Sequence, residues 1–573
     1  MSNTPNQLSL THRSFFAGFF PTWLMGTGLA YFLTGFLFNF YPAPLQFILL
    51  SLITQLLCGM SVMLLLDGVL NNLQSSRQRD WTTIAAIVPA PLFAVSTVIV
   101  AWQFPSLFDR QTLFMDLSML PLFIALSVVS TIGTLAFIKA LGRNDMLTAL
   151  RQNPAFIQLQ DNLPGAALAL IFFFTYFTLA ETINFPNFQT LDQYFDLDIS
   201  DWLARLVTPG RQDVIRVRAV HPAVLIFLRP LIWLTSIFLN GNRLHAVFLV
   251  NALTGALCVL VFWLIVKRLT KNTAYSLIMA SILGTSASHL LFSSMLETYI
   301  YSALALIVFV LVMQGEKKSL ARTIPIGTLV FGITITNFIQ TCILYFLAFP
   351  RLKTILKYVF LVLITTALLN VLQVRIYPNA RSALLPANFR VEQHYQFNLA
   401  KDSWHVTGRI VLIARAILLY GIVAPTPFIL TKELGAVVPN FRTFEIVLKE
   451  LHVAGYTGMA DIAVKFWILV VAIAGILFLL DLFRTPKQML FPISLLLCLG
   501  FNLILHIAYG DDPLLYSPDW VYALVLFVSF SFRKYADQKW IHIIMIVFLG
   551  LVMSANLKLI HQIMAVSAPF YGQ

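Results

Sequence analysis

The sequence predicts an all-α fold, a polytopic bundle of transmembrane helices with external interfacial helices and large external loops. Of its 573 residues, 59% are hydrophobic and 11% are charged, and the mean hydropathy is +0.82. Soluble domains hold about 45–50% apolar and about 25% charged residues. The apolar residues form continuous runs long enough to span a bilayer as helices, whereas the strands of a membrane barrel would alternate. An outer-membrane barrel is therefore excluded.

The net charge of +13 is a signal of membrane topology. Arg and Lys gather in short clusters between the apolar runs, which is the pattern of cytoplasmic loops. This distribution favours contact with membrane lipids, and we expect no nucleic-acid partner. The clusters are Arg77 and Arg79; Lys139, Arg143 and Arg151; Lys267, Arg268 and Lys271; Lys317, Lys318 and Arg322; Arg351, Lys353 and Lys357; Arg484 and Lys487; Arg533, Lys534 and Lys539.

Placing every basic cluster inside fixes the order of the spans. The N-terminus has no cleavage site, so the first span is expected to be retained. Four spans occupy residues 1–164, a region to which the sequence gives no role, and a fifth carries the chain out before residue 184. The expected full spans are 15–40, 45–70, 83–103, 117–138, 166–183, 243–266, 273–291, one that opens near Glu297, 355–370, 464–483, 489–509, 520–532 and 540–556.

Three further apolar segments do not fit a simple crossing. Residues 221–239 are expected to lie along the external interface, because a full span there would put the next basic cluster outside. Residues 324–349 are expected to form two short arms that meet near Thr336 and Asn337, and a broken helix at that depth lines a cavity. Residues 410–430 are expected to form a re-entrant or interfacial helix.

Four regions follow from this order: 1–164, a membrane core at 165–372 that includes an external acidic loop at 184–220, an external region at 373–463, and C-terminal helices at 464–573. Polar residues concentrate on one side of the predicted bundle. We expect a site that faces outward from the cytoplasmic, or inner, membrane. The four cysteines fall within apolar runs and indicate neither a disulfide framework nor a metal site.

The acidic loop holds three carboxylates within six residues, Asp196, Asp198 and Asp201, in a chain that has few. Arg216, Arg218 and His221-Pro222 follow. A plainer interpretation is open for each: loop carboxylates are usually solvated, Asp201 suits the start of a helix, and Pro222 suits a first turn. Glu297 stands between apolar spans, where a carboxylate is a functional hypothesis by default, although it also suits a structural pair with an Arg.

The order of these features resembles the GT-C superfamily, polytopic glycosyltransferases such as protein O-mannosyltransferases and aminoarabinose transferases. The resemblance runs from the acidic loop and His221-Pro222 through Arg243-Leu244 and Asn251-Ala252-Leu253 to the run Ser293–Tyr299. It covers the layout from Gly165 onward, and its specific part is Asp192–Tyr299. Two departures are present: Phe195-Asp196-Leu197-Asp198 replaces the family's Asp-Glu followed by Tyr, and Ala223 replaces a second proline.

The resemblance implies transfer of a sugar from a polyprenyl-phosphate donor to an acceptor whose identity stays open. Such chemistry needs a carboxylate near the acceptor and a cation near the departing phosphate. Asp198 is the first choice for the carboxylate and Asp196 the second, with Glu297 also in the catalytic set. The expected substrate-binding residues are Asp201, Arg216, Arg218, His221, Tyr299 and Asn337.

No cofactor is expected, because neither a phosphate loop nor a dinucleotide fingerprint is present. His and Cys do not recur at metal-ligand spacing, and the Asp cluster is only a weak signal for a divalent cation. The rival functions are a polymerase of lipid-linked oligosaccharides and a flippase or transporter. A transporter predicts inverted repeats with charges near mid-membrane in both halves, which the sequence does not show. A non-catalytic scaffold leaves Glu297 and the acidic loop unexplained.

Overall fold

The computed structural model describes residues 12–75, 81–143, 149, 152–184, 194–315, 319–397, 406–430 and 439–570. Several sequence predictions fall outside these ranges. They concern the basic residues Arg77, Arg79, Arg151, Lys317 and Lys318, residues 185–193 of the acidic loop, and residues 398–405 and 431–438 of the long polar region.

The predicted all-α class is confirmed for the described chain, and the protein is a multi-pass membrane protein. Nine helices among the described residues are long and apolar enough to cross a membrane. The strands described are short and form two antiparallel pairs: β1 (Phe428–Leu430) with β2 (Asn440–Arg442), and β3 (Phe444–Val447) with β4 (Glu450–Val453).

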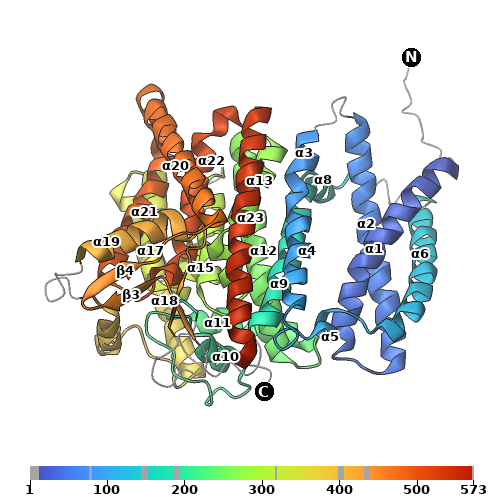
Figure 1. Cartoon of the computed structure of the whole chain (residues 1–573), viewed down its shortest axis with the longest axis horizontal. Helices are drawn as coiled ribbons and strands as arrows, with labels where there is room; N and C mark the ends of the chain where they lie inside the picture. Colours follow the sequence, from blue (N-terminus) through green and yellow to red (C-terminus); the bar gives the residue numbers. More distant parts are fainter. Residues whose placement is uncertain are drawn as a thin grey trace. The chain divides into compact units, whose positions relative to one another are not determined.

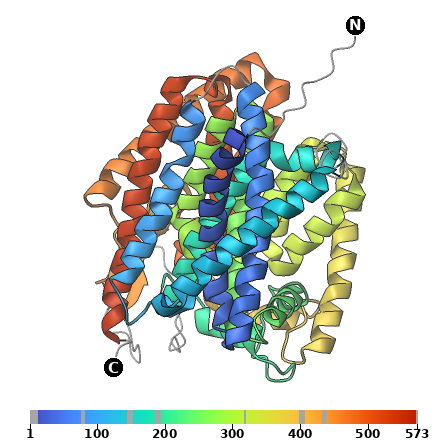
Figure 2. The ribbon, with the colours of Figure 1, turned by 90° about the vertical axis from the view of Figure 1, so that its right-hand side faces the viewer.

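The chain divides into two compact units, and the smaller comprises residues 1–80 and 109–164. Its helices α1 (His12–Phe38) and α2 (Pro44–Ser75) lie side by side in both views (Figures 1 and 2). Gly26 permits this approach, since a Cβ there would lie 3.0 Å from the Gly59 backbone. The other helices of this unit are α5 (Arg110–Leu113), η1 (Leu117–Met119), α6 (Leu120–Arg143) and α8 (Pro154–Asp161).

The larger unit comprises residues 81–108 and 165–573. It therefore includes α3 (Trp81–Ile87) and α4 (Pro89–Trp102), which the sequence analysis had grouped with the rest of residues 1–164. The reason is packing: α3 contacts α13 (Thr273–Thr285), and α4 contacts α23 (Lys539–Ser567), beside which it runs in Figure 1.

The remaining helices of the larger unit form the bundle that carries the site. They are α9 (Leu163–Ile183), α10 (Ile199–Val207), α11 (Val224–Ile237), α12 (Arg243–Thr270), α14 (Ala287–Phe292), α15 (Tyr299–Met313), α16 (Leu320–Ile333), η2 (Ile335–Asn337), α17 (Phe338–Ala348), α18 (Leu352–Ile376), η3 (Pro386–Tyr395), α19 (Val406–Arg415), η5 (Ala416–Tyr420), α20 (Met459–Arg484), η6 (Pro486–Met489), α21 (Leu490–Ala508), η7 (Pro513–Tyr516), α22 (Pro518–Ser531), η8 (Arg533–Tyr535) and η9 (Ala568–Phe570).

The break expected near Thr336 and Asn337 is present. Helix α16 ends at Ile333, Thr334 is extended (φ −148°, ψ 115°), and α17 begins after the single turn η2. The freed backbone groups bind the segment before α11: Gly332 O accepts from the Ala223 N–H at 2.8 Å, and the Ile335 N–H donates to Val220 O at 3.2 Å. The break thus fixes residues 220–223 against the bundle, as buried backbone groups require partners.

Two other expected helices differ from the prediction. The segment 273–291 is not one span, because α13 ends at Thr285 and the extended Ser286 separates it from α14. The N–H groups of Ala287 and Ser288 bind the carbonyls of Ile422 and Gly421 instead. The apolar run 410–430 is helical only to Tyr420 and then becomes extended at β1, which pairs with β2.

Candidate functional site

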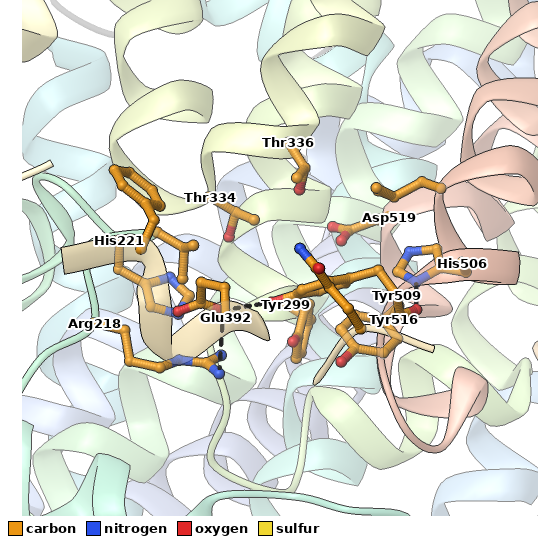
Figure 3. Close-up of a pocket in the computed structure, with 14 residues that line it drawn as sticks. Arg218, His221, Tyr299, Thr334, Thr336, Glu392, His506, Tyr509, Tyr516 and Asp519 are labelled. Carbon is orange, nitrogen blue, oxygen red and sulfur yellow. Dashed lines mark hydrogen bonds and ion pairs between the residues drawn. The ribbon is translucent and has the colours of Figure 1, made fainter. Parts of the chain in front are cut away.

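A cavity of about 220 Å³ lies where several helices of the larger unit begin or end (Figure 3). Its walls come from the loop before α11, the start of α15, the break between α16 and α17, η3, the end of α21, η7 and the start of α22. The lining residues are Arg218, Val220, His221, Tyr299, Thr334, Thr336, Phe389, Glu392, Gln396, Leu505, His506, Tyr509, Tyr516 and Asp519. Three predicted site residues, Arg218, His221 and Tyr299, are among them.

Arg218 is the one Arg or Lys among the described residues that line the cavity. Its Nη1 lies 3.7 Å from Glu392 Oε2, and its guanidinium lies 4.7 Å from the centre of the Tyr395 ring. Burial disfavours its charge, but Glu392 and the neighbouring tyrosines outweigh burial and raise the pKa of Arg218 above its ordinary value. The cavity therefore holds a permanent cation.

Glu392 faces Arg218 from η3 and is buried (6% exposed). Its Oε2 accepts a hydrogen bond of 2.7 Å from the Tyr509 hydroxyl, while Oε1 has no hydrogen-bond partner among the described residues. A buried carboxylate oxygen without a donor is costly. This oxygen is therefore a candidate for binding a hydroxyl group in the cavity.

His221 is buried and neutral. Its Nδ1–H donates to the Ile333 carbonyl at the broken helix, at 2.7 Å. Burial, with Arg218 nearby, lowers the pKa of His221 to about 3. His221-Pro222 does more than begin a helix. Helix α11 begins at Val224, and the His221 imidazole anchors the preceding loop to the break between α16 and α17. His221 is thus a positioning residue that also forms part of the cavity wall.

The acidic loop is held in an unusual conformation beside the cavity. Phe195 and Asp196 both have positive φ angles, 52° and 69°, which non-glycine residues rarely adopt. Two contacts to β2 stabilise them: the Phe195 N–H donates to Phe441 O at 2.8 Å, and Asp196 pairs with Arg442 at 2.8 Å. Asp196, the second-choice base, is therefore engaged in a structural ion pair.

The structure brings Asp198 and Glu297 together. The Asp198 N–H donates to Glu297 Oε2 at 3.2 Å, and the Thr298 N–H donates to Oε1 at 2.8 Å. Glu297 is 4% exposed and lies in the turn between α14 and α15. Burial and the neighbouring Asp198 carboxylate raise the pKa of Glu297. The pair therefore tends to keep a proton that an isolated carboxylate would release.

The alternative that Glu297 forms a structural ion pair with an Arg is not seen among the described contacts. Neither Arg216 nor Arg218 forms an ion pair with Glu297 among the described contacts: Arg218 binds Glu392, and the Arg216 side chain is exposed. Backbone and hydroxyl donors satisfy Glu297 instead, because it accepts from both the N–H and the Oγ of Thr298. Arg216 does not line the cavity.

Two predicted residues have structural contacts outside the cavity lining. Asp201 pairs with Arg205 at 2.6 Å one turn along α10, which agrees with its plainer interpretation as a helix residue. Asn337 is buried at the break, accepts a 3.1 Å hydrogen bond from Gln340, and interacts with Asp519, which does line the cavity.

Most of the far wall consists of residues that were not predicted from the sequence: Glu392, His506, Tyr509, Tyr516 and Asp519. Arg409 shapes this wall, because its guanidinium donates to the backbone carbonyls of His506, Tyr509, Gly510 and Asp511. The sequence feature that could have indicated this wall is the pair of adjacent carboxylates Asp511 and Asp512 between two apolar runs.

Among the described residues, no group of three or more His, Cys, Asp or Glu is arranged to hold a metal ion. Comparison of the chain with protein-family models, with curated proteins and with solved structures gives no match.

Proposed function

We propose that the protein is a membrane glycosyltransferase with a GT-C-like fold, which moves a sugar from a polyprenyl-phosphate carrier to a lipid, glycan or protein acceptor on the external face of the cytoplasmic membrane. The observation that carries the proposal is a cavity in a membrane helix bundle whose described lining has one Arg and a wall of tyrosines, with a pair of carboxyl groups, Asp198 and Glu297, outside the lining but close to it.

The donor phosphate is assigned to Arg218. A guanidinium suits a phosphate because its N–H groups form paired hydrogen bonds with two oxygens. At 3.7 Å the existing contact with Glu392 is longer than a strong charge-assisted hydrogen bond, so a phosphate oxygen competes with it. The polyprenyl chain would then extend into the surrounding lipid.

The sugar is assigned to the space between the tyrosines and Glu392. The rings of Tyr299 and Tyr516 meet edge to face at 5.3 Å and form a rigid wall. Ligand cavities typically join such apolar walls to a few placed polar groups. Glu392 Oε1, buried and without a donor among the described residues, supplies an acceptor for a sugar hydroxyl.

The transfer step uses the Asp198 and Glu297 pair. The acceptor oxygen forms a bond to the anomeric carbon, its proton passes to Asp198, and the anomeric carbon–oxygen bond to the phosphate breaks. The polyprenyl phosphate leaves with the electron pair, and Arg218 stabilises the added negative charge. Glu297 orients Asp198 by accepting its backbone N–H, and it does not contact the substrate.

Mass spectrometry of envelope glycans and lipid-linked sugars tests this proposal. Cells that lack the protein should accumulate one polyprenyl-phosphate sugar and lose one monosaccharide from an envelope component. The wild-type gene should restore both signals, and a gene carrying Arg218→Gln should not. Unchanged sugar profiles in the deletion strain would contradict the proposal, and altered oligosaccharide chain length without loss of a monosaccharide would instead support a polymerase.

A further inference from the structure

A second hollow of about 300 Å³ lies along the C-terminal half of α23 in the larger unit. Its wall is apolar and made of small residues, and its rim is polar. The wall consists of Ala424, Pro425, Ala460, Ala555, Leu559 and Ala565, and the rim of Thr426, Thr457, Lys558, His561 and Gln562. None of these residues lines the first cavity.

Helix geometry places this hollow at a membrane boundary. Lys558 follows Lys539, the first residue of α23, by 19 residues, which corresponds to about 28 Å along a helix. The hydrocarbon core of a bilayer is about 30 Å thick. The hollow lies at the same end of the bundle as the acidic loop, because the Ser567 hydroxyl, at the end of α23, bonds the Tyr194 hydroxyl at 2.7 Å.

The rim carries positive charge without a matching carboxylate. Lys558 forms no ion pair with any described residue, and no Asp or Glu lines the hollow. Asp461, beside Ala460, is already paired with Lys465 at 2.7 Å. Lys558, His561 and Gln562 are three and four residues apart, so they share one face of α23.

We propose that this hollow binds the phosphate headgroup of an anionic phospholipid. Lys558 and Gln562 donate to the phosphate, and the glycerol and first methylenes pack on Leu559. The Thr426 and Thr457 hydroxyls bond to each other at 3.0 Å, which leaves one hydroxyl hydrogen to donate to the phosphate. The apolar wall and the position at the boundary favour a lipid over a soluble phosphate, which would use only the rim. This inference does not depend on the proposed transfer activity.

Native mass spectrometry of the full-length protein with phosphatidylglycerol tests the proposal. The wild type should retain the lipid, and Lys558→Gln should retain about fivefold less, the contribution of one lysine near an anionic lipid surface. Lys449→Gln is the matched control, because it removes the same charge from an exposed residue that is neither in the hollow nor in a basic cluster, and it should change nothing. Equal retention by Lys558→Gln and the wild type would overturn the site.

Two further ligands separate the possible sources of binding. Diacylglycerol, which lacks the phosphate, should be retained poorly by all variants, and inorganic phosphate alone should not raise the unfolding temperature. Retention of diacylglycerol equal to that of phosphatidylglycerol, or stabilisation by inorganic phosphate that Lys558→Gln removes, would overturn the assignment to a phospholipid. If Lys558→Gln unfolds, Gln562→Leu replaces it, with the same expected direction.

Discussion

Buried carboxylates occur at both ends of α22, and they are neutralised in opposite ways. Near the end of α22, Asp481 accepts from Lys534 at 2.5 Å and from Arg533 at 3.0 Å, so two cations surround one carboxylate. The cavity lies near the start of α22. Beside it, the described hydrogen-bond donors to Glu297 are neutral N–H and O–H groups, and a second carboxylate, Asp198, is its neighbour.

This difference in partners distinguishes Asp481, which belongs to a structural ion pair, from Glu297, which belongs to the candidate site. Asp481 and Glu297 are equally hidden, at 6% and 4% exposed, so burial alone does not distinguish them. A carboxylate between two cations has no capacity left for a proton or a ligand. A buried carboxyl group beside a second carboxylate holds its proton more tightly than an isolated one, and such groups gather where proton transfer occurs.

The largest effect is expected at Asp198. Asp198→Asn keeps the shape of the side chain but removes the proton acceptor, so transfer should fall by about 10²–10⁴-fold. Turnover of the polyprenyl-phosphate sugar found by the envelope analysis is the measurement. Asp201→Asn is the matched control on the same loop, since Asp201 only pairs with Arg205. Turnover in Asp198→Asn equal to that of the control would remove Asp198 from the mechanism.

The next effect concerns stability at the other end of α22. Asp481→Asn leaves Arg533 and Lys534 without their carboxylate, so unfolding should become easier by about 1–3 kcal/mol. Thermal unfolding in detergent measures it, while turnover per folded molecule should stay unchanged. Asp461→Asn, which breaks an exposed pair with Lys465, should change stability by less than about 1 kcal/mol. Loss of turnover without loss of stability in Asp481→Asn would contradict the structural role assigned to Asp481.

A smaller effect is expected at the contact that holds the acidic loop. Arg442→Gln removes the ion pair with Asp196, whose φ of 69° is then less well supported. Turnover should fall about fivefold, equivalent to about 1 kcal/mol, because Asp198 is less firmly placed. Lys449→Gln, an exposed cation on the turn between β3 and β4, is the control and should behave as the wild type. Identical turnover in both variants would show that β2 does not position the loop.

The smallest effect on turnover is expected for Glu297→Gln, because the amide oxygen still accepts from the Asp198 N–H. Its signature is instead pH dependence. The native pKa of Glu297 is raised above 4.5, so the unfolded chain releases this proton first, and wild-type stability should fall as pH rises from that value. The unfolding temperature of Glu297→Gln should fall less steeply over the same range. Parallel curves for both proteins would contradict the raised pKa.

The sequence predicted the membrane class and the helices that form long continuous apolar runs. It also predicted the break near Asn337, because one continuous helix there would have placed a basic cluster on the wrong side. Glu297 was predicted as a site residue because an isolated carboxylate between apolar runs is costly in a membrane. Its contact with Asp198 could not be predicted, because the two residues are 99 positions apart in the chain.

The far wall of the cavity escaped prediction for physical reasons. Glu392 lies in a 3-10 segment that has no apolar period, and polar residues there resemble a solvated loop. In the sequence, Tyr509 and Tyr516 are typical of aromatic residues at a membrane interface. In the folded chain they line the same cavity as Arg218. The partner of Arg218 was likewise hidden, because Glu392 is 174 residues away in the chain.

Binding of polyprenyl phosphate to the protein in nanodiscs tests the central claim most directly. Arg218→Gln should weaken binding by about 10-fold or more, the loss expected when a charge-assisted hydrogen bond disappears. Arg216→Gln removes the same charge two residues away, from an exposed side chain outside the cavity lining, and should bind as the wild type does. Equal binding by wild type, Arg218→Gln and Arg216→Gln would contradict the assignment of this cavity to a lipid-phosphate donor.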